Sequence, residues 1–365
     1  MANKKIWLRI MVTVLVFVMA NVGCDNGSTN SDNGSTNGNV GWRDFSMTDA
    51  VIISQDGIAF QGYFPDGKIS IIKDEVAEKY IAFWAEAVNF RTEANTPYLE
   101  DHISQVKSEN SVFGIGFNQQ DGFNDGGSWF MGVHKLSDGR LAGFFHAESH
   151  WPVGIGAYKS LGVAYSSNNG HTWTDANKIL NVNYLKPSAA QWSGLGDGCV
   201  VYNEKRGQFI CYYSASADGD YRICMAASSD PAGAPETWKK WNGSNFTADG
   251  YNSISGVGGI DTQITGLQSI AGANPSVHWN SYLQKWIMVY HGWEQVVYMS
   301  SSNDGLVWEN PIALTDLSRE RAWYPNLIGD NGDATGSKVL KLYYALNQNE
   351  STGIRELAVR TLTFK

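Results

Sequence analysis

The sequence predicts an all-β domain built from repeated antiparallel meanders. Its composition is rich in glycine and aromatic residues, with 39 Gly, 14 Trp, 17 Tyr and 15 Phe among 365 residues, and only 17% of the residues are charged. Short strands and turn signals recur along the chain as a meander of irregular length. The net charge of −9, without a basic stripe, argues against a nucleic-acid partner and leaves neutral polymers and small molecules open.

The beginning of the chain has the pattern of an export signal. Three basic residues within the first nine are followed by an uncharged, mostly apolar stretch at 10–20. This stretch is too short for a stable transmembrane helix but suits a secretory signal peptide over residues 1–23. Gly23-Cys24 resembles a bacterial lipobox, in which signal peptidase cuts before a cysteine whose thiol becomes lipidated.

A polar segment at 24–41 begins with the predicted lipidated Cys24. It contains the hexapeptide DNGSTN twice, and such a composition cannot bury a core, so it is predicted to be a flexible linker. The sequence therefore predicts an exported bacterial lipoprotein in the cell envelope, facing the periplasm or the cell surface. An ordinary secreted protein is the alternative. The lipid anchor is the only membrane contact predicted.

Residues 42–365 are predicted to form one β-propeller domain. Four meanders are clear, beginning near residues 128, 199, 275 and 324, and a fifth is expected within 48–72. Five blades are favoured, with six as the alternative, and a helix is expected only over 74–88. The last strand is expected to complete the first blade, because closing the ring removes exposed sheet edges.

A turn motif occurs twice in this domain. SSNNGHTW at 166–173 and SSNDGLVW at 301–308 both fit Ser-x-Asn-x-Gly-x-x-Trp. Asn and Asp cap their own backbone and Gly supplies a positive φ, so each copy predicts a tight hairpin between two strands. The motif resembles the Asp-box of sialidase-type β-propellers. This resemblance implies the fold rather than the chemistry, because such turns usually lie away from the active site.

Three cysteines remain once Cys24 is set aside. Cys199, Cys211 and Cys224 lie at nearly symmetric distances from two predicted turns, so all three are expected in one cross-strand row on one face. Three small buried thiols are the favoured interpretation, with a cross-strand disulfide at Cys211 as the alternative. The Cys and His spacings do not fit a zinc site.

Four acidic residues are candidates for catalysis, because function in a propeller is found where the inner strands open onto the central channel. Asp125 and Asp197 precede predicted inner strands, Glu148 ends a strand between two histidines, and Glu294 occupies a corresponding turn. Paired carboxyl groups can hydrolyse a glycoside: one protonates the leaving oxygen, and the other activates water or attacks the anomeric carbon. The structural alternatives are turn-forming aspartates and salt-bridged glutamates.

Five further residues are candidates for substrate binding. His146 and His150 flank Glu148, where they could bind sugar hydroxyls or tune the carboxyl group. Trp129 and Trp323 could stack on apolar sugar faces, although tryptophan also fills the space between propeller blades. Arg91 could contribute to an arginine cluster that grips a substrate carboxylate.

The resemblance widens over residues 120–345. The order of GRLAGFFHAE, GDGCVVY, NPSVHWNSYLQKWIMVY and WYPNLIG looks like Asp-box propellers related to five-bladed glycoside hydrolases, such as the family 43 arabinanases and xylosidases and the family 32 fructosidases. It implies a glycoside hydrolase with three acidic residues around the axis. The sequence lacks the WMNDPNG and RDP motifs of family 32, so the resemblance assigns no individual roles.

Other functions stay open alongside the favoured hydrolase of a polysaccharide or oligosaccharide. A non-catalytic surface propeller that binds glycans is the main alternative, and a sialidase or a polysaccharide lyase are lesser ones. A catalytic site needs two carboxyl groups roughly 5–10 Å apart, whereas a binding site does not. No cofactor is expected, although a structural Ca²⁺ in the channel would suit converging carboxylate and carbonyl oxygens. A monomer with a carbohydrate partner is predicted.

Overall fold

The computed structural model describes residues 41–365 except 115–121, 218–219, 268–270, 293, 317–319 and 348–353. The predicted signal peptide, Cys24 and the linker up to residue 40 lie outside the described residues. The described part is an all-β unit, with three single turns of 3₁₀ helix, η1 (Leu99–Asp101), η2 (Ile103–Gln105) and η3 (Ser108–Asn110). No helix among the described residues is long and apolar enough to cross a membrane.

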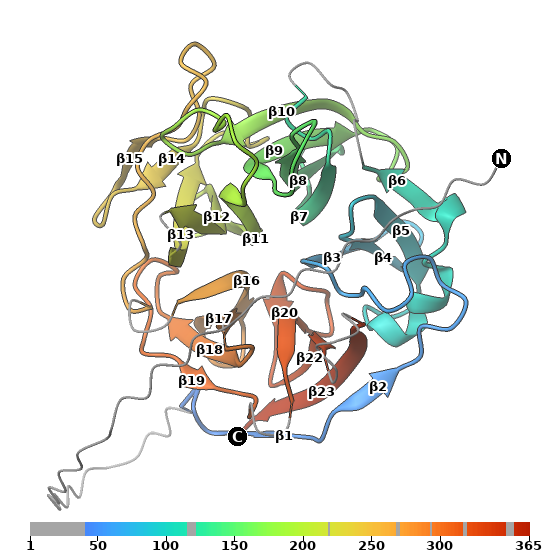
Figure 1. Ribbon diagram of the computed structural model, residues 1–365. Helices are drawn as coiled ribbons and strands as arrows, with labels where there is room; N and C mark the ends of the chain where they lie inside the picture. Colours follow the sequence, from blue (N-terminus) through green and yellow to red (C-terminus); the bar gives the residue numbers. More distant parts are fainter. Residues whose placement is uncertain are drawn as a thin grey trace, which may run out of the picture. The chain divides into compact units, whose positions relative to one another are not determined.

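The described strands pair mainly as five antiparallel meanders around a common centre, shown in Figure 1. The first contains β3 (Ile69–Asp74), β4 (Lys79–Trp84), β5 (Asn89–Ala94) and β6 (Ser111–Phe113). The second contains β7 (Gly127–Lys135), β8 (Leu141–Ser149), β9 (Tyr158–Ser166) and β10 (Thr174–Leu180). The third contains β11 (Ser193–Asn203), β12 (Gln208–Ala217), β13 (Asp220–Ser228), β14 (Lys239–Trp241) and β15 (Phe246–Asp249).

The remaining strands form the fourth and fifth meanders. The fourth contains β16 (Gly272–Asn280), β17 (Lys285–Gly292), β18 (Val297–Ser302) and β19 (Ile312–Ala313), with β21 (Thr335–Gly336) added parallel to β16. The fifth contains β20 (Ala322–Ile328), β22 (Val339–Leu346), β23 (Glu356–Phe364), β1 (Phe45–Met47) and β2 (Val51–Ile53). Each meander has one strand nearest the centre. These inner strands are β3, β7, β11, β16 and β20, as Figure 1 shows.

Ring closure joins the two ends of the domain in one sheet. The N-terminal strands β1 and β2 both pair antiparallel with β23, so they complete the fifth meander. The prediction that the last strand completes the first blade is therefore wrong. Instead, the first strands complete the last meander. The meander expected within 48–72 is also wrong, because this segment divides between β2 and the beginning of β3.

The helix expected over 74–88 is not formed. Strand β4 (Lys79–Trp84) lies in the middle of this segment, and its residues Ile81 to Trp84 are completely buried. Asp74 ends β3 by accepting the backbone N–H groups of Val76 and Ala77, which starts the turn into β4. Burial of both strand faces thus outweighs the helix propensity of the surrounding Glu, Ala and Lys residues.

The hydrophobic core consists of layers between neighbouring meanders. Between the first two, the ring of Phe83 contacts Phe130 and Trp173 at centroid distances of 5.9 and 5.8 Å. Three similar clusters join the second to the third meander, the third to the fourth, and the fourth to the fifth. A further cluster contains both Tyr343 of β22 and Trp84 of β4, so the fifth meander packs against the first.

The first predicted turn motif forms a hairpin between β9 and β10. The Ser166 hydroxyl accepts the backbone N–H of Gly170 at 2.9 Å, and the indole N–H of Trp173 donates to the Gly170 carbonyl at 3.1 Å. In the second copy the contacts shift by one residue, because Ser302 rather than Ser301 accepts the N–H of Gly305.

A related turn between β13 and β14 was missed by the sequence pattern. Ser228 accepts the N–H of Asp230, and the indole N–H of Trp238 donates to the Gly233 carbonyl at 2.9 Å. Its glycine and tryptophan are five positions apart, compared with three in the two repeats. The same tryptophan-to-carbonyl contact is thus built on a longer loop.

The three described cysteines are buried and free. Cys211 and Cys224 share the core layer between the second and third meanders, whereas Cys199 lies in the layer between the third and fourth. The prediction of one row on one face is therefore wrong for Cys199. The strand register explains this, since Cys199 pairs with Tyr212 and Cys211 pairs with Val200.

We expect Ser166→Ala to destabilise the protein by about 1–2 kcal/mol, because the buried N–H of Gly170 would lose its acceptor. Urea denaturation of the variant and the wild type measures this difference. Ser167→Ala at the exposed neighbouring position is the matched control and should change stability by less than about 0.5 kcal/mol. Equal effects of the two substitutions would show that the Ser166 hydrogen bond does not stabilise the turn.

Candidate functional site

The inner strands begin on one face of the described unit, and three of them carry strained backbone near that end. Asp197 in β11, Asn274 in β16 and Tyr324 in β20 have φ values of 40°, 53° and 50°. Each lies within an irregularity of the strand pairing. Residues other than glycine rarely adopt this left-handed conformation, and such strain is concentrated at functional sites.

Asp197 is the best-supported anion of this face. Its Oδ1 lies 3.1 Å from Nδ1 of His146, and its Oδ2 lies 3.7 Å from Nζ of Lys159. Burial alone would raise the pKa of the Asp197 carboxyl, but Lys159 and then His146 hold it well below its usual range. Asp197 is therefore a carboxylate at neutral pH.

The pairing of β9 with β11 places Lys159 beside Asp197. These strands pair in parallel at their first residues, with Gly194 opposite Lys159. Gly194 has a φ of 102°, and a Cβ on it would lie 2.2 Å from the Lys159 carbonyl oxygen. A glycine is therefore required for the two strands to approach.

Glu148 lies next to this pair, at the end of β8. Its Oε2 is 3.2 Å from Nε2 of His150, and its Oε1 is 3.6 Å from Nε2 of His146. The Asp125 carboxylate accepts the backbone N–H of His150 at 2.8 Å, but its side chain belongs to an exposed loop. The predicted Glu148, Asp197, His146 and His150 thus lie together, with Asp125 at the edge.

A second acidic group approaches the same face from the segment before β3. Asp66 forms an ion pair with Arg355 and accepts a hydrogen bond from the indole N–H of Trp129 at 3.2 Å. Trp129 also stacks on His146, with ring centroids 5.2 Å apart, and so links the two acidic groups. Burial raises the pKa of Asp66 despite the Arg355 charge, and the negative charge of Asp197 raises it further.

Glu86 provides a carboxyl group that holds its proton. It lies in the turn between β4 and β5, and only 8% of its surface is exposed. Burial, and then the charge of Asp66, raise the pKa of Glu86 to about 8. Its Oε1 accepts the N–H of Ala87, while its buried Oε2 has no hydrogen-bond partner among the described residues.

The fourth and fifth meanders supply aromatic groups. The ring of buried His291 lies 4.7 Å from that of Trp323 and 5.8 Å from that of Tyr324, and the Arg355 guanidinium lies 4.9 Å above the Tyr324 ring. Burial lowers the pKa of His291 to about 4, although Asp197 opposes this shift. Trp323, predicted to bind substrate, therefore lies within the group that includes Arg355.

Two predicted site residues have other surroundings. Glu294 accepts a hydrogen bond from the Tyr298 hydroxyl at the turn between β17 and β18. Arg91 pairs with Glu93 and donates from Nε to the Asn169 carbonyl at 2.9 Å, which anchors the turn after β9. Neither side chain forms a hydrogen bond or an ion pair with Asp197 or Asp66.

Several residues of this site were missed from the sequence: Asp66, Glu86, Lys159, His291 and Arg355. One signal existed, since Asp66-Gly67 before β3 repeats the Asp197-Gly198 step within β11. Glu86 was hidden within the segment expected to be helical. Lys159 and Arg355 look like ordinary strand residues until the ring closes.

A buried ion pair joins the residue before β3 to the turn before β21. Lys68, whose side chain is almost completely buried, lies 2.8 Å from Asp333 and donates to the Ile69 carbonyl. Among the described residues, no three His, Cys, Asp or Glu side chains are grouped to hold a metal ion. The structural Ca²⁺ considered from the sequence therefore finds no such group of ligands among the described residues.

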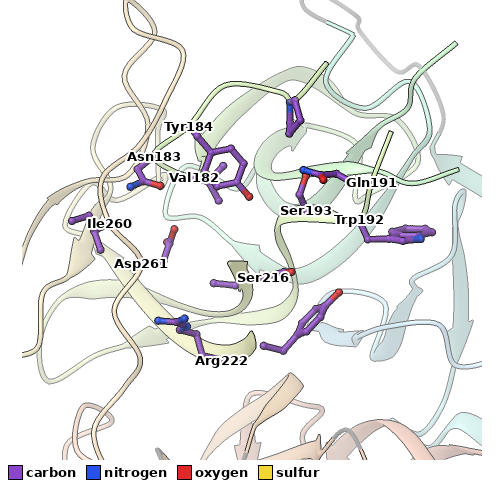
Figure 2. Close-up of a pocket in the computed structure, with 13 residues that line it drawn as sticks. Val182, Asn183, Tyr184, Gln191, Trp192, Ser193, Ser216, Arg222, Ile260 and Asp261 are labelled. Carbon is purple, nitrogen blue, oxygen red and sulfur yellow. The ribbon is translucent and has the colours of Figure 1, made fainter. Parts of the chain in front are cut away.

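A cavity of about 660 Å³ lies between the segment that joins β10 to β11 and the strands β12 and β13 of the third meander (Figure 2). In Figure 2, Asn183, Tyr184 and Asp261 lie on one side of the opening, and Gln191 and Ser193 lie on the other. Lys159 connects the cavity to the acidic site, because its Nζ lies 5.4 Å from the ring of Trp192, which lines the cavity, and 3.7 Å from Asp197.

Solved structures with the same fold include carbohydrate-active enzymes. A family 117 glycoside hydrolase from the marine bacterium Zobellia galactanivorans matches with a TM-score of 0.53 and 12% identity, covering 88% of this chain and 91% of its own. The catalytic domain of a Coprinopsis cinerea family 62 α-L-arabinofuranosidase matches with a TM-score of 0.50 and 11% identity, covering 88% and 97%. A Dyadobacter fermentans protein of unknown function has a TM-score of 0.50 and 12% identity, covering 88% and 100%.

These comparisons show a propeller fold like that of glycoside hydrolases. No known family model matches the sequence, and no curated protein is significantly similar to it. At such low identity the likeness concerns the fold, so the chemistry has to be argued from the residues of this chain.

We expect Glu86→Gln to stabilise the protein increasingly as the pH rises. A pKa raised from 4.5 to about 8 means that the folded protein keeps a proton that the unfolded chain loses, so the wild type loses stability between these pH values. The variant should gain about 2–4 kcal/mol relative to the wild type between pH 5 and pH 8.5.

Urea denaturation at both pH values measures this gain, with Glu204→Gln in the exposed turn after β11 as the control. A difference between Glu86→Gln and the wild type that does not depend on pH would show that Glu86 is ionised in the folded protein.

Proposed function

We propose that this protein is a glycoside hydrolase acting on a polysaccharide or oligosaccharide at the face formed by Asp66, Glu86 and Asp197. The observation that carries the proposal is the opposite electrostatic environment of these carboxyl groups. Asp197 is held ionised by Lys159 and His146, whereas burial raises the pKa of Asp66 and Glu86. Hydrolysis of a glycoside requires both forms in one site.

In this mechanism Asp197 acts as the base or nucleophile. Its negative charge is available at neutral pH, and His146 and Lys159 fix its two oxygens. The Asp66–Glu86 pair supplies the proton for the leaving oxygen. Asp66 is the more exposed member, with 22% of its side chain accessible, and Glu86 holds its proton up to a pH of about 8.

The surroundings of these groups suit a sugar. Trp129 and Trp323 offer aromatic surface beside the carboxyl groups, and Trp192 is half exposed at the adjoining cavity. Apolar sugar faces pack against such rings, while hydroxyl groups need polar partners. A sialidase is less well supported, because Arg91 is engaged with Glu93 and Asn169 away from the acidic groups.

We further propose that the five meanders are the five blades of the propeller, and that the Ser-x-Asn-x-Gly-x-x-Trp turns are Asp-boxes. Anchoring through a lipidated Cys24 in a bacterial cell envelope, after removal of residues 1–23, remains part of the proposal. The polar linker after Cys24 would allow a lipid-anchored propeller to reach a polymeric substrate. The proposal also includes a monomeric protein that needs no cofactor.

We expect Asp197→Asn to lower hydrolysis by about a hundredfold or more, because the base or nucleophile is removed. Asn tolerates the left-handed backbone of this position, so the fold should be retained. The full-length protein is assayed on aryl glycosides and on plant, algal and microbial polysaccharides, with circular dichroism as the test of folding. Asp138→Asn, in the exposed turn after β7, is the control and should retain activity.

Asp66→Asn and Glu86→Gln identify the proton donor. Loss of the donor should reduce cleavage of substrates with poor leaving groups much more than cleavage of dinitrophenyl glycosides, which leave without protonation. A structural role would reduce both alike. Wild-type protein that binds a glycan saturably but cleaves nothing in the panel would replace the hydrolase with a non-catalytic glycan-binding propeller.

A further inference from the structure

The cavity lined by Trp192 contains a cation without a counter-ion. Arg222 projects from β13 into this cavity and is only partly exposed. Among the described residues, its guanidinium group has no carboxylate within ion-pair distance and no hydrogen-bond partner. A half-buried guanidinium group with no partner is costly, and an anionic ligand would remove that cost.

Among the described residues that line the cavity, Asp261 is the one carboxylate, and it is already neutralised. Asp261 lies 2.7 Å from the buried Lys240 ammonium group and accepts a hydrogen bond from the Tyr213 hydroxyl at 2.8 Å. Lys240 donates in addition to the carbonyl groups of Asn181 and Gly259, which fixes it beside Asp261. The charge of Arg222 therefore dominates this wall of the cavity.

A buried hydroxyl group without a hydrogen-bond partner among the described residues lines the opposite wall. Ser193 is 95% buried, and its hydroxyl has no hydrogen-bond partner among the described residues. Ser193 begins β11, next to Gly194, which pairs with Lys159. Buried hydroxyl groups are normally hydrogen-bonded, so an unpartnered one that lines a cavity indicates a missing acceptor or donor.

The cavity and the acidic site share one surface. Lys159 bridges them through Asp197 and the ring of Trp192, which is 52% exposed. Ile260, also exposed, lines the cavity together with Tyr184. A sugar unit could pack on these apolar groups while its polar substituents reach Arg222 and Ser193.

We infer that this cavity is a subsite for a sugar unit that carries an oxyanion, either a carboxylate or a sulfate ester, with Arg222 as the counter-ion and Ser193 as a hydrogen-bond partner. The inference rests on the proposed function for its ligand class, and it narrows the substrate to acidic glycans. The guanidinium fork suits both oxyanions, because each presents two oxygens in one plane.

Binding of matched tetrasaccharides to the full-length protein tests this inference. Galacturonan and its methyl ester differ in carboxylate charge, and κ-carrageenan and its desulfated form differ in sulfation. Calorimetry should show that at least one acidic member binds about tenfold or more tightly than its neutral counterpart, and that added salt reduces this preference. The pair that shows the preference identifies the oxyanion.

Substitution of Arg222 locates the preference. Arg222→Gln should abolish it, Arg222→Lys should retain part of it because the charge remains but the fork is lost, and Ser193→Ala should weaken it. Arg140→Gln, in an exposed hairpin turn and paired with Asp138, is the matched control. Equal binding of acidic and neutral sugars, no binding of either acidic sugar, or a preference that survives Arg222→Gln would overturn the inference.

Cleavage assays on the same sugars separate this inference from the proposed hydrolase. Binding of an acidic tetrasaccharide that depends on Arg222, without cleavage of any sugar in the wider panel, would support the subsite and reject the hydrolase. Cleavage that depends on Asp197 but makes no distinction between charged and neutral sugars would support the hydrolase and reject the subsite.

Discussion

Burial of apolar residues on both faces of every meander is the constraint on which the structure depends. A sheet of this kind is stable only when both faces are covered, and here each face is covered by the next meander. The series of layers ends only when the fifth meander packs against the first, in the cluster that contains Tyr343 and Trp84. The N-terminal strands β1 and β2 then cover the open edge of β23.

Ring closure also creates the acidic site. Asp66 precedes β3 of the first meander, Asp197 lies in β11 of the third, and Arg355 precedes β23 of the fifth, so closure of the ring brings together residues that are far apart in the sequence. Buried charged groups need partners of opposite charge. The partners available to each carboxyl group differ, and so does the protonation state that results. Asp197 gains Lys159 and His146 as partners and stays ionised, whereas burial and the nearby charge of Asp66 outweigh the charge of Arg355 at Glu86, which keeps its proton. Opposite protonation states in one site thus follow from packing.

The candidate site was only partly visible in the sequence. Asp197, Glu148 and His146 stood out because polar residues at strand ends are unusual in so apolar a context. The site residues Glu86 and Lys159 had no such signal, since one lay in a segment of helical composition and the other in a normal strand. Glu294 showed the reverse error: its turn matched the pattern, yet its carboxylate is bonded to Tyr298.

The sequence by itself determined the all-β class, the meander repeat and the two hairpin turns, because alternation of apolar residues and Gly-containing turns are local properties. Only the tertiary structure decided which strand closes the ring, where Cys199 lies, and which carboxyl groups are ionised. These properties depend on strand register and on burial by distant residues. An Asp at a strand end acquires its chemistry from the neighbours that the closed ring brings to it.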